Sequence, residues 1–426
     1  MREGQCKLFE TSRKNRRREI HVRIDQIIGK EALKEARGTN QMGVRLYNER
    51  LVLSLIRRHG MLPKAELARL TGLSAQTTSV IVRQLEKDGL VMKGEPQRGK
   101  VGQPLVPFAL NPDGAFSVGL KVGRRSGDLM LIDLSGARRG MVHQPYHFPT
   151  PAEFLDFARE GMAKLLTDFT PAMRKRISGL GIAAPFELWN WEAEAGAPHE
   201  VLEKWRGFDL MGEVAKLFDF PVFPCNDATA ACAAELLFGN GQRAADFAYF
   251  YVGYFIGGGL VLNGSLVQGR SGNAAAFGSI PVPKAEGGAQ QLIQCASFYS
   301  LELALNRSGQ NASIMWQAEE DWSAIGKALD EWLPGAAAGL SDAMLAVAAV
   351  TECSEVIIDG AMPPAVRARL VSAVQQALLK ATRSGITPFH VREGGIGRDA
   401  RALGAAALPL FANFVIDRDV LFKEAL

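Results

Sequence analysis

One segment, KAELARLTGLSAQTTSVIVRQLEKDG at residues 64–89, restricts the possible fold more than any other part of the chain. Pro63 stands at the first turn of a predicted helix, Gly72 supplies a tight turn, and Ser74 is a predicted N-cap. A second helix follows and ends at Gly89. Two helices joined by a short glycine-containing turn, the second beginning with small polar residues, are typical of a helix-turn-helix.

A further helix and a hairpin flank this segment and complete a predicted winged domain over residues 44–110. The leucine-rich stretch that ends at Gly60 predicts the helix. After the helix-turn-helix, LVMKGEPQRGKVGQPLVPFALNP predicts two short strands around a loop, the wing. Arg98 and Lys100 at the tip of the wing, with Gln103 beside them, are candidates for contacts with the minor groove or with backbone phosphates.

The second helix of the helix-turn-helix presents side chains that can read DNA. Ile81 and Leu85, four residues apart, face the predicted core, which leaves a polar face outward. Arginine and glutamine carry paired groups that read base edges, serine and threonine bind phosphates or bases, and Val80 suits a thymine methyl group rather than a polar contact. A three-helix packing unit that binds no DNA is the alternative. The candidate DNA contacts on this helix are Ser74, Gln76, Thr77, Thr78, Ser79 and Arg83.

The charge of the chain changes sign near residue 110. Residues 1–110 contain 22 Lys and Arg against 11 Asp and Glu, whereas the remainder contains 27 against 34. Because phosphate neutralisation needs clustered cations, a basic front on an acidic body is typical of a nucleic-acid-binding module attached to a second domain, although a solvated basic face gives the same count. Residues 1–43, with Arg13, Lys14 and Arg16–Arg18, are expected to form a mobile or partly helical arm that contacts phosphates non-specifically.

Cysteine usage and hydropathy predict a cytoplasmic protein. The five cysteines are scattered and lack the paired spacing of a disulfide framework or a zinc site. The N-terminus lacks the apolar segment of a signal peptide, and no apolar run approaches the roughly 18 residues of a membrane helix. We therefore expect reduced thiols and no membrane association.

From Ala115 onward, short apolar runs alternate with helical patterns, which predicts an α/β body. Predicted strands include residues 116–122 and 128–133, and FPVFPCNDATAACAAELLFGN predicts a strand that leads into an alanine-rich helix. Asn226 and Asp227 stand at this junction, where an Asp is either a helix cap or a base for a sugar hydroxyl. The local pattern favours the cap.

Glycines mark two further features of the body. GLVL, Asn263-Gly264 and SLVQG predict a β-hairpin with a two-residue type I′ turn. The triplet Gly257–Gly259 just before it suits a bulge or tight bend better than a backbone approach to a phosphate. VIIDG at residues 356–360 predicts another strand, and residues 394–411 predict a glycine turn and a final alanine-rich helix.

Five motifs in this order resemble the ROK family, which groups sugar-responsive bacterial repressors with sugar kinases: GKVGQPLVPFALNP, GLGIAAP, NDATAACAAE, IGGGLVLNGSLVQGRSGNAA and LGAAAL. The resemblance extends from about residue 44 to the last residues. It implies a two-lobed α/β body with the actin-like ATPase (ribonuclease H-like) fold. The first lobe would comprise residues 115–235 plus 386–426, the second residues 240–385, and a ligand would bind between them.

The phosphate loop of the family's kinases has changed in this chain. Where those enzymes carry an Asp-x-Gly-Gly-Thr-like loop, the sequence reads GLKVGRRSGD, so Lys121 occupies the Asp position and Arg124, Arg125 and Ser126 follow. A cation at the position of the metal-binding carboxylate interferes with magnesium placement and phosphoryl transfer. We therefore expect no enzymatic activity and no cofactor.

The sugar and zinc motifs of the family have changed as well. The Glu-x-Gly-His motif aligns with AFGS, so Ala276 replaces the Glu and Ser279 the His. The family's Cys-x-Cys-Gly-x-x-Gly-Cys-x-Glu zinc segment aligns with the shorter VPKAEGGAQQLIQCAS, in which Gln291 aligns with the last ligand Cys and Ile293 with the sugar-binding Glu. Cys295 alone cannot form a tetrahedral site, so we expect no metal.

The resemblance leaves a small set of candidate effector-binding residues. Asn226 and Asp227 match the family's sugar contact and catalytic base, and Asp227 is expected to be vestigial because the metal and sugar clamps around it are lost. The smaller, more apolar surface suits a ligand other than the family's ordinary hexoses. The candidate effector site comprises Asn226, Asp227, Gly258, Gly259 and Ser279.

Together these features predict a sequence-specific transcriptional regulator that acts as a repressor. Its expected partners are a near-palindromic double-stranded DNA operator, further copies of the chain in a homodimer or homotetramer, and a carbohydrate or related small molecule as effector. An active ROK sugar kinase with a DNA-binding appendage is one alternative, which the presence of Asp227 motivates. A regulator without any small-molecule effector is the other.

Overall fold

The computed structural model describes residues 41–96, 105–146, 150–185, 199–240, 244–317 and 321–416. Contacts divide the chain into a small unit, of which residues 41–51 and Ile416 are described, and a large unit over Val52–Val415. The predicted N-terminal arm lies outside the described residues, apart from residues 41–43 at the start of the first described helix.

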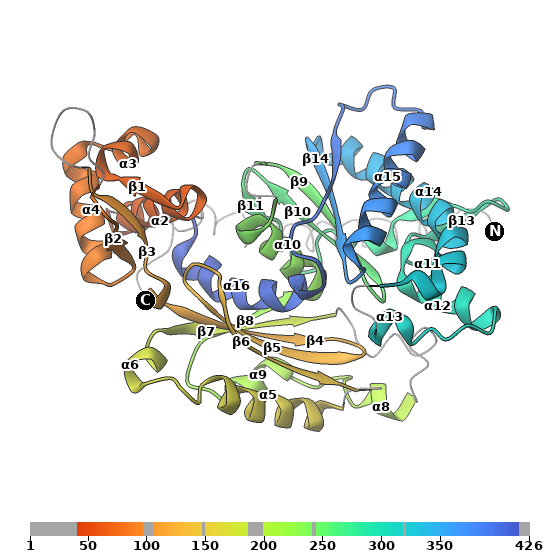
Figure 1. Cartoon of the computed structure of the whole chain (residues 1–426), viewed down its shortest axis with the longest axis horizontal. Coiled ribbons are helices and arrows are strands. Elements are labelled where there is room, and N and C mark those ends of the chain that lie inside the picture. Colours follow the sequence, from red (N-terminus) through yellow and green to blue (C-terminus); the bar gives the residue numbers. More distant parts are fainter. Residues whose placement is uncertain are drawn as a thin grey trace, which may run out of the picture. The chain divides into compact units, whose positions relative to one another are not determined.

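The first described elements form the predicted winged helix-turn-helix (Figure 1). Gly60 and Gly72 have φ angles of +82° and +71°, a left-handed conformation that ends the first two helices. Ser74 caps the third helix by accepting a hydrogen bond from the backbone N–H of Thr77. The strands pair in the antiparallel order β1-β3-β2. In chain order the elements are α2 (Gln41–His59), β1 (Met61–Pro63), α3 (Lys64–Thr71), α4 (Ala75–Lys87), β2 (Val91–Lys93) and β3 (Pro107–Leu110).

The first lobe of the body is a five-stranded sheet with strand order β6-β5-β4-β7-β8. Strands β4, β7 and β8 are parallel, and β4, β5 and β6 form an antiparallel meander. Helix α5, through Phe154 and Phe157, packs on one face of the sheet, and α16 lies on the other (Figure 1). The elements are η1 (Pro112–Gly114), β4 (Phe116–Val122), β5 (Ser126–Asp133), β6 (Arg138–Pro145), α5 (Pro151–Leu165), α6 (Pro171–Arg174), β7 (Ile177–Ala184), α8 (His199–Glu203), α9 (Leu210–Ala215), β8 (Val222–Asn226) and α16 (Ala400–Phe414).

The second lobe contains a five-stranded sheet with strand order β11-β10-β9-β14-β15. The hairpin between β10 and β11 has the predicted turn, because Asn263 and Gly264 have φ angles of +53° and +72°. The elements are α10 (Asp227–Phe238), β9 (Phe247–Val252), β10 (Ile256–Leu262), β11 (Ser265–Leu266), η4 (Phe277–Ser279), β12 (Pro281–Pro283), β13 (Ala289–Gln291), α11 (Ile293–Ala296), α12 (Phe298–Arg307), α13 (Ile314–Gln317), η5 (Ser323–Ile325), α14 (Gly326–Thr351), β14 (Glu355–Gly360), α15 (Pro364–Lys380), β15 (His390–Glu393) and η6 (Gly397–Asp399).

The predicted lobe boundary at residue 386 needs correction. Strand β15 pairs in parallel with β14, so it completes the second sheet although the sequence assigned residues 386–426 to the first lobe. Because the backbone of β15 forms its hydrogen bonds with β14, β15 belongs to the second sheet. Of the described residues beyond 386, those of α16 are the ones that pack on the first sheet.

Helix α16 approaches its neighbours so closely that side chains would not fit between them. A Cβ atom at Gly119 on β4 would lie 2.2 Å from the backbone nitrogen of Ala406, and one at Gly181 on β7 would lie 1.8 Å from the carbonyl oxygen of Ala405. On the other side, a Cβ at Gly404 would lie 1.8 Å from the carbonyl oxygen of Ala230 on α10. Glycine at these positions is therefore a requirement of the packing.

Several contacts join the winged domain to the first lobe, and two of them involve α2 and α16. Arg57 on α2 donates a hydrogen bond of 2.8 Å to the carbonyl of Leu134, which follows β5. Phe414, the last residue of α16, packs against the hydrophobic core of the winged domain, and both Phe414 and Leu110 of β3 also pack against the cluster that contains Leu134 and Ala402. Burial lowers the pKa of Arg57 to about 10, and Asp133 opposes that shift.

One described helix is long and apolar enough to cross a membrane by length and composition, although the sequence predicted none. The segment Ser323–Thr351 contains it, and 56% of its apolar window is buried inside the protein. Leu329, Leu340 and Met344 of this helix belong to the core of the second lobe. Such burial is typical of the core helix of a globular domain.

We predict that Gly404→Ala destabilises the fold by about 1–3 kcal/mol, because the added methyl group collides with the backbone of α10. Gly335→Ala is the matched control, since Gly335 is also helical and a Cβ there meets nothing within 4 Å. The control should be neutral or slightly more stable than the unmodified chain. Urea unfolding of the two variants measures the difference, and equal midpoints would contradict the packing argument.

Candidate functional site

The exposed face of α4 carries most of the residues predicted to read DNA. Gln76, Thr77 and Arg83 are exposed, and Ser79 is partly exposed. The Nε of Arg83 donates a hydrogen bond of 3.1 Å to the carbonyl of Ser79. Val80 lies on the same face with 55% of its surface exposed, so an apolar side chain is also presented.

Thr78 and Ser74, two of the predicted DNA contacts, differ in their exposure. The Thr78 side chain is completely buried, because it lies on the core face with Ile81 and Val82, so the prediction that it contacts DNA is wrong. Ser74 is exposed, and its hydroxyl is hydrogen-bonded to the hydroxyl of Thr77 as well as to its backbone N–H.

The wing is described only in part. Strands β2 and β3 pair as predicted, but Arg98, Lys100 and Gln103 lie outside the described residues.

A second candidate site, which we call the polar cavity, lies between β8, α10, β10 and η4. Its volume is about 120 Å³. It contains Asn226, Asp227, Gly258 and Ser279 of the predicted effector site. Ala276 and Ile293 also line it, so the residues that replace the family's acidic clamps face the same space.

Asn226 and Asp227, at the junction between β8 and α10, have different roles in the structure. Asn226, not Asp227, caps α10, and its side-chain oxygen accepts from the backbone N–H groups of Ala228 and Thr229 at 3.0 and 3.3 Å. The carboxylate of Asp227 instead lies 3.1 Å from Nη1 of Arg401. The favoured interpretation of Asp227 as the cap is therefore wrong, and its carboxylate forms an ion pair in the cavity wall.

The glycine triplet forms neither a bulge nor a phosphate loop. Gly257, Gly258 and Gly259 are regular members of β10, each paired with a residue of β9. A Cβ at Gly259 would lie 2.2 Å from the Cβ of Cys232 on α10, so this glycine permits close contact between the strand and the helix. Gly259 does not line the polar cavity, which corrects its assignment to the effector site, whereas Gly258 does line it.

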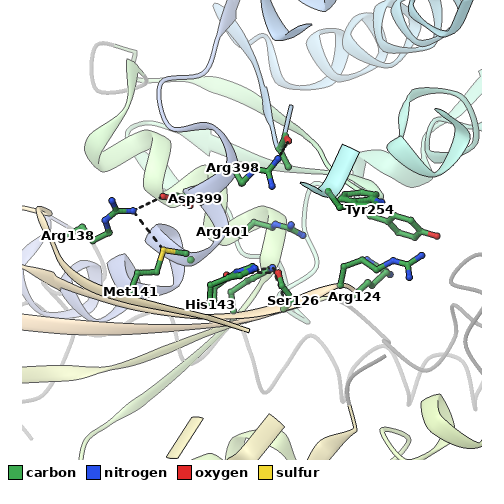
Figure 2. Close-up of a pocket in the computed structure, with 15 residues that line it drawn as sticks. Arg124, Ser126, Arg138, Met141, His143, Tyr254, Arg398, Asp399 and Arg401 are labelled. Carbon is green, nitrogen blue, oxygen red and sulfur yellow. Dashed lines mark hydrogen bonds and ion pairs between the residues drawn. The ribbon is translucent and has the colours of Figure 1, made fainter. Parts of the chain in front are cut away.

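A larger cavity, which we call the basic cavity, adjoins the polar cavity and has a volume of about 360 Å³ (Figure 2). Arg124 and Arg401 line both cavities. Six cationic side chains and two carboxylates are in its lining. The lining comprises Lys121, Arg124, Arg125, Ser126, Asp128, Arg138, Met141, His143, Tyr254, Trp316, Ala361, Arg398, Asp399, Arg401 and Ala402.

Lys121 forms a buried network at one wall of the basic cavity. Its ammonium nitrogen lies 2.7 Å from the carboxylate of Asp128 and 2.9 Å from the hydroxyl of Ser126, and His143 is hydrogen-bonded to the other oxygen of Asp128. Burial lowers the pKa of the Lys121 ammonium, and the Asp128 carboxylate opposes that shift. Although burial also disfavours a charged carboxylate, Lys121 and His143 hold the pKa of Asp128 well below its ordinary value.

This network does not fit a magnesium nucleotide. The only carboxylate in contact with Lys121 among the described residues is already engaged on both oxygens, whereas a metal–ATP site needs an open carboxylate. Nor do the residues fit the family's zinc, since no group of three His, Cys, Asp or Glu side chains suited to a metal occurs in the part of the chain that is described. The expected absence of metal and cofactor stays a prediction.

Sequence reasoning missed three arginines of the basic cavity. Arg138 follows an exposed turn, and Arg398 and Arg401 surround the start of an alanine-rich helix, so local pattern gave none of them a chemical role. Arg401 lies 5.0 Å from the ring centre of Tyr251 and pairs with Asp227. The one available signal was the accumulation of arginine in GRDAR, directly after the predicted glycine turn.

Two segments of the chain match known protein families. Residues 117–410 match the family described as the ROK family. Residues 45–92 match the family described as winged helix-turn-helix DNA-binding. The first match covers more than half of the chain.

Relatives of this chain include a protein described as uncharacterized and two described as regulators. Protein y4fQ of Sinorhizobium fredii, described as uncharacterized, is 24% identical over 86% of this chain and 91% of its own length. The xylose repressor of Bacillus subtilis is 26% identical over 64% of this chain and 70% of its own length. The DNA-binding transcriptional dual regulator NagC of Escherichia coli is 23% identical over 56% of this chain and 58% of its own length.

Solved structures confirm the predicted fold class. A ROK family transcriptional regulator, described as a homolog of the E. coli MLC protein, has a TM-score of 0.64 and 20% identity and covers 89% of this chain and 100% of its own. A ROK family glucokinase from Streptomyces griseus, in complex with glucose and AMPPNP, has a TM-score of 0.53 and 21% identity over 69% of this chain and 99% of its own. The body therefore has the two-lobed actin-like ATPase fold.

We predict that Asp128→Asn lowers the free energy of unfolding at pH 7 by about 3–5 kcal/mol, because it leaves the buried Lys121 ammonium without its carboxylate. The folded-state pKa of Asp128 is depressed, so its contribution is complete above the unfolded pKa of about 3.9 and is lost as the pH falls toward the folded value. The variant should lack this part of the acid dependence.

Urea unfolding between pH 3 and pH 7 measures both effects. Asp156→Asn, which breaks an exposed pair with Arg159 on α5, is the control and should change stability little. If the two variants unfold at the same urea concentration at pH 7, the buried pair does not carry the stability assigned to it.

Proposed function

Because the chain belongs to the ROK family, we propose that it is a transcriptional regulator, acting as a repressor, that recognises a near-palindromic double-stranded DNA operator and lacks kinase activity. The observation that carries the proposal is the polar, exposed face of α4 within a winged helix-turn-helix. The changed phosphate loop around Lys121 supports the second part.

The spacing on α4 suits reading in the major groove. Gln76 and Arg83 are seven residues, or two helical turns, apart, so they lie on one face about 10 Å from each other along the axis. That length corresponds to about three base pairs. Val80 lies between them and can contact a thymine methyl group. Thr77 and Ser79 can bind phosphates or base edges on either side.

The proposed repressor is a symmetric oligomer that binds a small-molecule effector. Two copies related by a two-fold axis, in a homodimer or a homotetramer, place two α4 helices on the half-sites of a palindrome. The xylose repressor and NagC are relatives, and the name of the first supports a carbohydrate or related molecule as effector. Asn226, Asp227, Gly258 and Ser279 of the polar cavity are its proposed contacts. A regulator without a small-molecule effector stays the alternative.

Two positions in the chain support the absence of kinase activity. Phosphoryl transfer needs a metal ion held beside the phosphates. Lys121 stands at the Asp position of the family's phosphate loop and is paired with Asp128, which supports the loss of that metal site. A sugar hydroxyl needs a base that can accept its proton, and the carboxylate of Asp227 is paired with Arg401. Asp227 is the feature that keeps an active kinase as the second candidate function.

We predict that the purified chain enriches an inverted repeat from random duplex DNA and that the double variant Gln76→Ala, Arg83→Ala loses this enrichment. Each lost base contact should cost about 1–3 kcal/mol, or roughly 5-fold to 150-fold in affinity for the selected site. Arg159→Ala, which removes an exposed arginine from the body, is the control and should retain the selectivity. Binding that is salt-sensitive but blind to sequence in the unmodified chain would refute the proposal.

We predict that ATP-dependent phosphorylation of hexoses by the chain does not exceed the background of the Asp227→Asn variant. A coupled assay with glucose, xylose and N-acetylglucosamine measures this difference. Turnover at enzyme-like rates of about 1 per second or more, abolished in the variant, would establish the kinase alternative instead.

A further inference from the structure

The winged domain is joined to the body by a short, hydrogen-bonded connection. A single residue, Asn111, separates β3 from η1, and a single residue, Ala115, separates η1 from β4. The backbone N–H of Asn111 donates a hydrogen bond of 2.9 Å to the carbonyl of Leu90, and its Nδ2 donates one of 2.7 Å to the carbonyl of Gly89. A connection of this kind does not act as a flexible tether between domains.

The end of the helix that carries the DNA-reading face is in direct contact with the first lobe. Gly89 follows α4, and a Cβ at Gly114 of η1 would lie 2.7 Å from its carbonyl oxygen. Arg176, which precedes β7, donates hydrogen bonds of 3.3 and 3.1 Å to the carbonyls of Asp113 and Gly114. A Cβ at Gly89 would lie 2.9 Å from Nη2 of the same arginine. The position of α4 is therefore tied to the backbone of the body.

Arg57 on α2 forms a second support at a different place. Its Nη1 donates a hydrogen bond of 2.8 Å to the carbonyl of Leu134, between β5 and β6. Its guanidinium carbon lies 5.9 Å from the ring centre of Phe238, the last residue of α10. A Cβ at Gly136 would lie 2.2 Å from that ring, so the turn between β5 and β6 is itself packed on Phe238. One side chain of the winged domain thus contacts two elements of the body.

An apolar cluster continues between these two supports. Leu90 and Leu110 of the winged domain pack against the same cluster as Phe238, and Leu134 is a completely buried member of it. Domains of one chain move relative to each other by default unless the interface between them is apolar and extensive. The shared cluster therefore opposes rotation of the winged domain on the first lobe.

The chemistry of Arg57 suits orientation better than stabilisation. Its Nε and Nη2 atoms are buried and have no hydrogen-bond partner among the described residues. An apolar side chain would fill the same space without the cost of removing a charge from water. A hydrogen bond to one carbonyl is directional, however, so it favours one angle between α2 and the first lobe.

We propose that Arg57 is a positioning residue that holds the winged domain in one orientation on the first lobe, and that the body thereby sets a single spacing between the two half-sites of the operator. The spacing rests on the proposed function, whereas the docking of the winged domain does not. A tethered domain would reach half-sites over a range of spacings. A docked domain reaches them at one distance and one angle, because each inserted base pair moves a half-site by about 3.4 Å and rotates it by about 34°.

Hydrogen exchange of the full chain without DNA tests the docking. Arg57→Ala should accelerate exchange at residues 132–137 by about tenfold or more, because the hydrogen bond from a charged group to Leu134 is lost. Arg58→Ala, which changes the neighbouring exposed arginine of α2, is the matched control and should leave this exchange unchanged. Strand β9 in the second lobe is the internal reference, and its unchanged exchange shows that the variant is folded.

Duplexes that carry two copies of the selected half-site test the spacing. The unmodified chain should bind the selected spacing at least about tenfold more tightly than spacings that differ by 2 or 5 base pairs, the latter being about half a turn of DNA. Arg57→Ala should reduce this preference to about threefold or less and retain its affinity for a single half-site. Arg58→Ala should retain the preference, even if the lost charge weakens binding to every duplex.

Three outcomes overturn the proposal. They are rapid exchange at residues 132–137 in the unmodified chain, an Arg57→Ala variant with unchanged exchange and an unchanged spacing preference, and equal binding of all spacings by the unmodified chain. If the chain selects no DNA sequence although Arg57→Ala accelerates exchange, the proposed function is refuted and the docking role of Arg57 stands. Selection of a half-site without preference for its spacing would refute this inference alone.

Discussion

The close contact of α16 with its neighbours fixes the arrangement on which the body depends. Gly119, Gly181 and Gly404 let the backbone of this helix touch two strands of the first sheet and the backbone of α10. Helix α10 in turn lies against β10 through Gly257 and Gly259, so the two helices connect the two sheets. Asp227 begins α10 and Arg401 lies in the first turn of α16, so the same packing brings their side chains into an ion pair.

The buried ion pair of Lys121 bears directly on phosphoryl transfer in this fold. Transfer needs in-line geometry and a metal ion at the phosphates, and both depend on a carboxylate that is open to the metal. Asp128 is engaged by Lys121 and His143, which supports the proposal that the chain does not transfer phosphoryl groups.

Features that act over a few residues could be predicted from the sequence, and features that depend on distant packing could not. The Ser74 cap and the Asn263-Gly264 turn depend on local dihedral angles and hydrogen bonds, and both occur as predicted. Thr78 fits the polar composition of α4, but the rotation of the helix on its core turns it inward. The basic cavity gathers side chains such as Arg138 and Arg401, whose separation along the chain is bridged only by the folding of α16 onto the first sheet.

Helix α16 extends from the wall of the basic cavity to the core of the winged domain. Arg401 in its first turn lines the basic cavity, and Phe414 at its last residue packs against the core of the winged domain. Any ligand of the body changes operator affinity only as far as it binds two arrangements of the chain unequally. Glycine leaves no side chains between α16 and its sheet, so the backbone of this connecting helix is in direct contact with the first lobe.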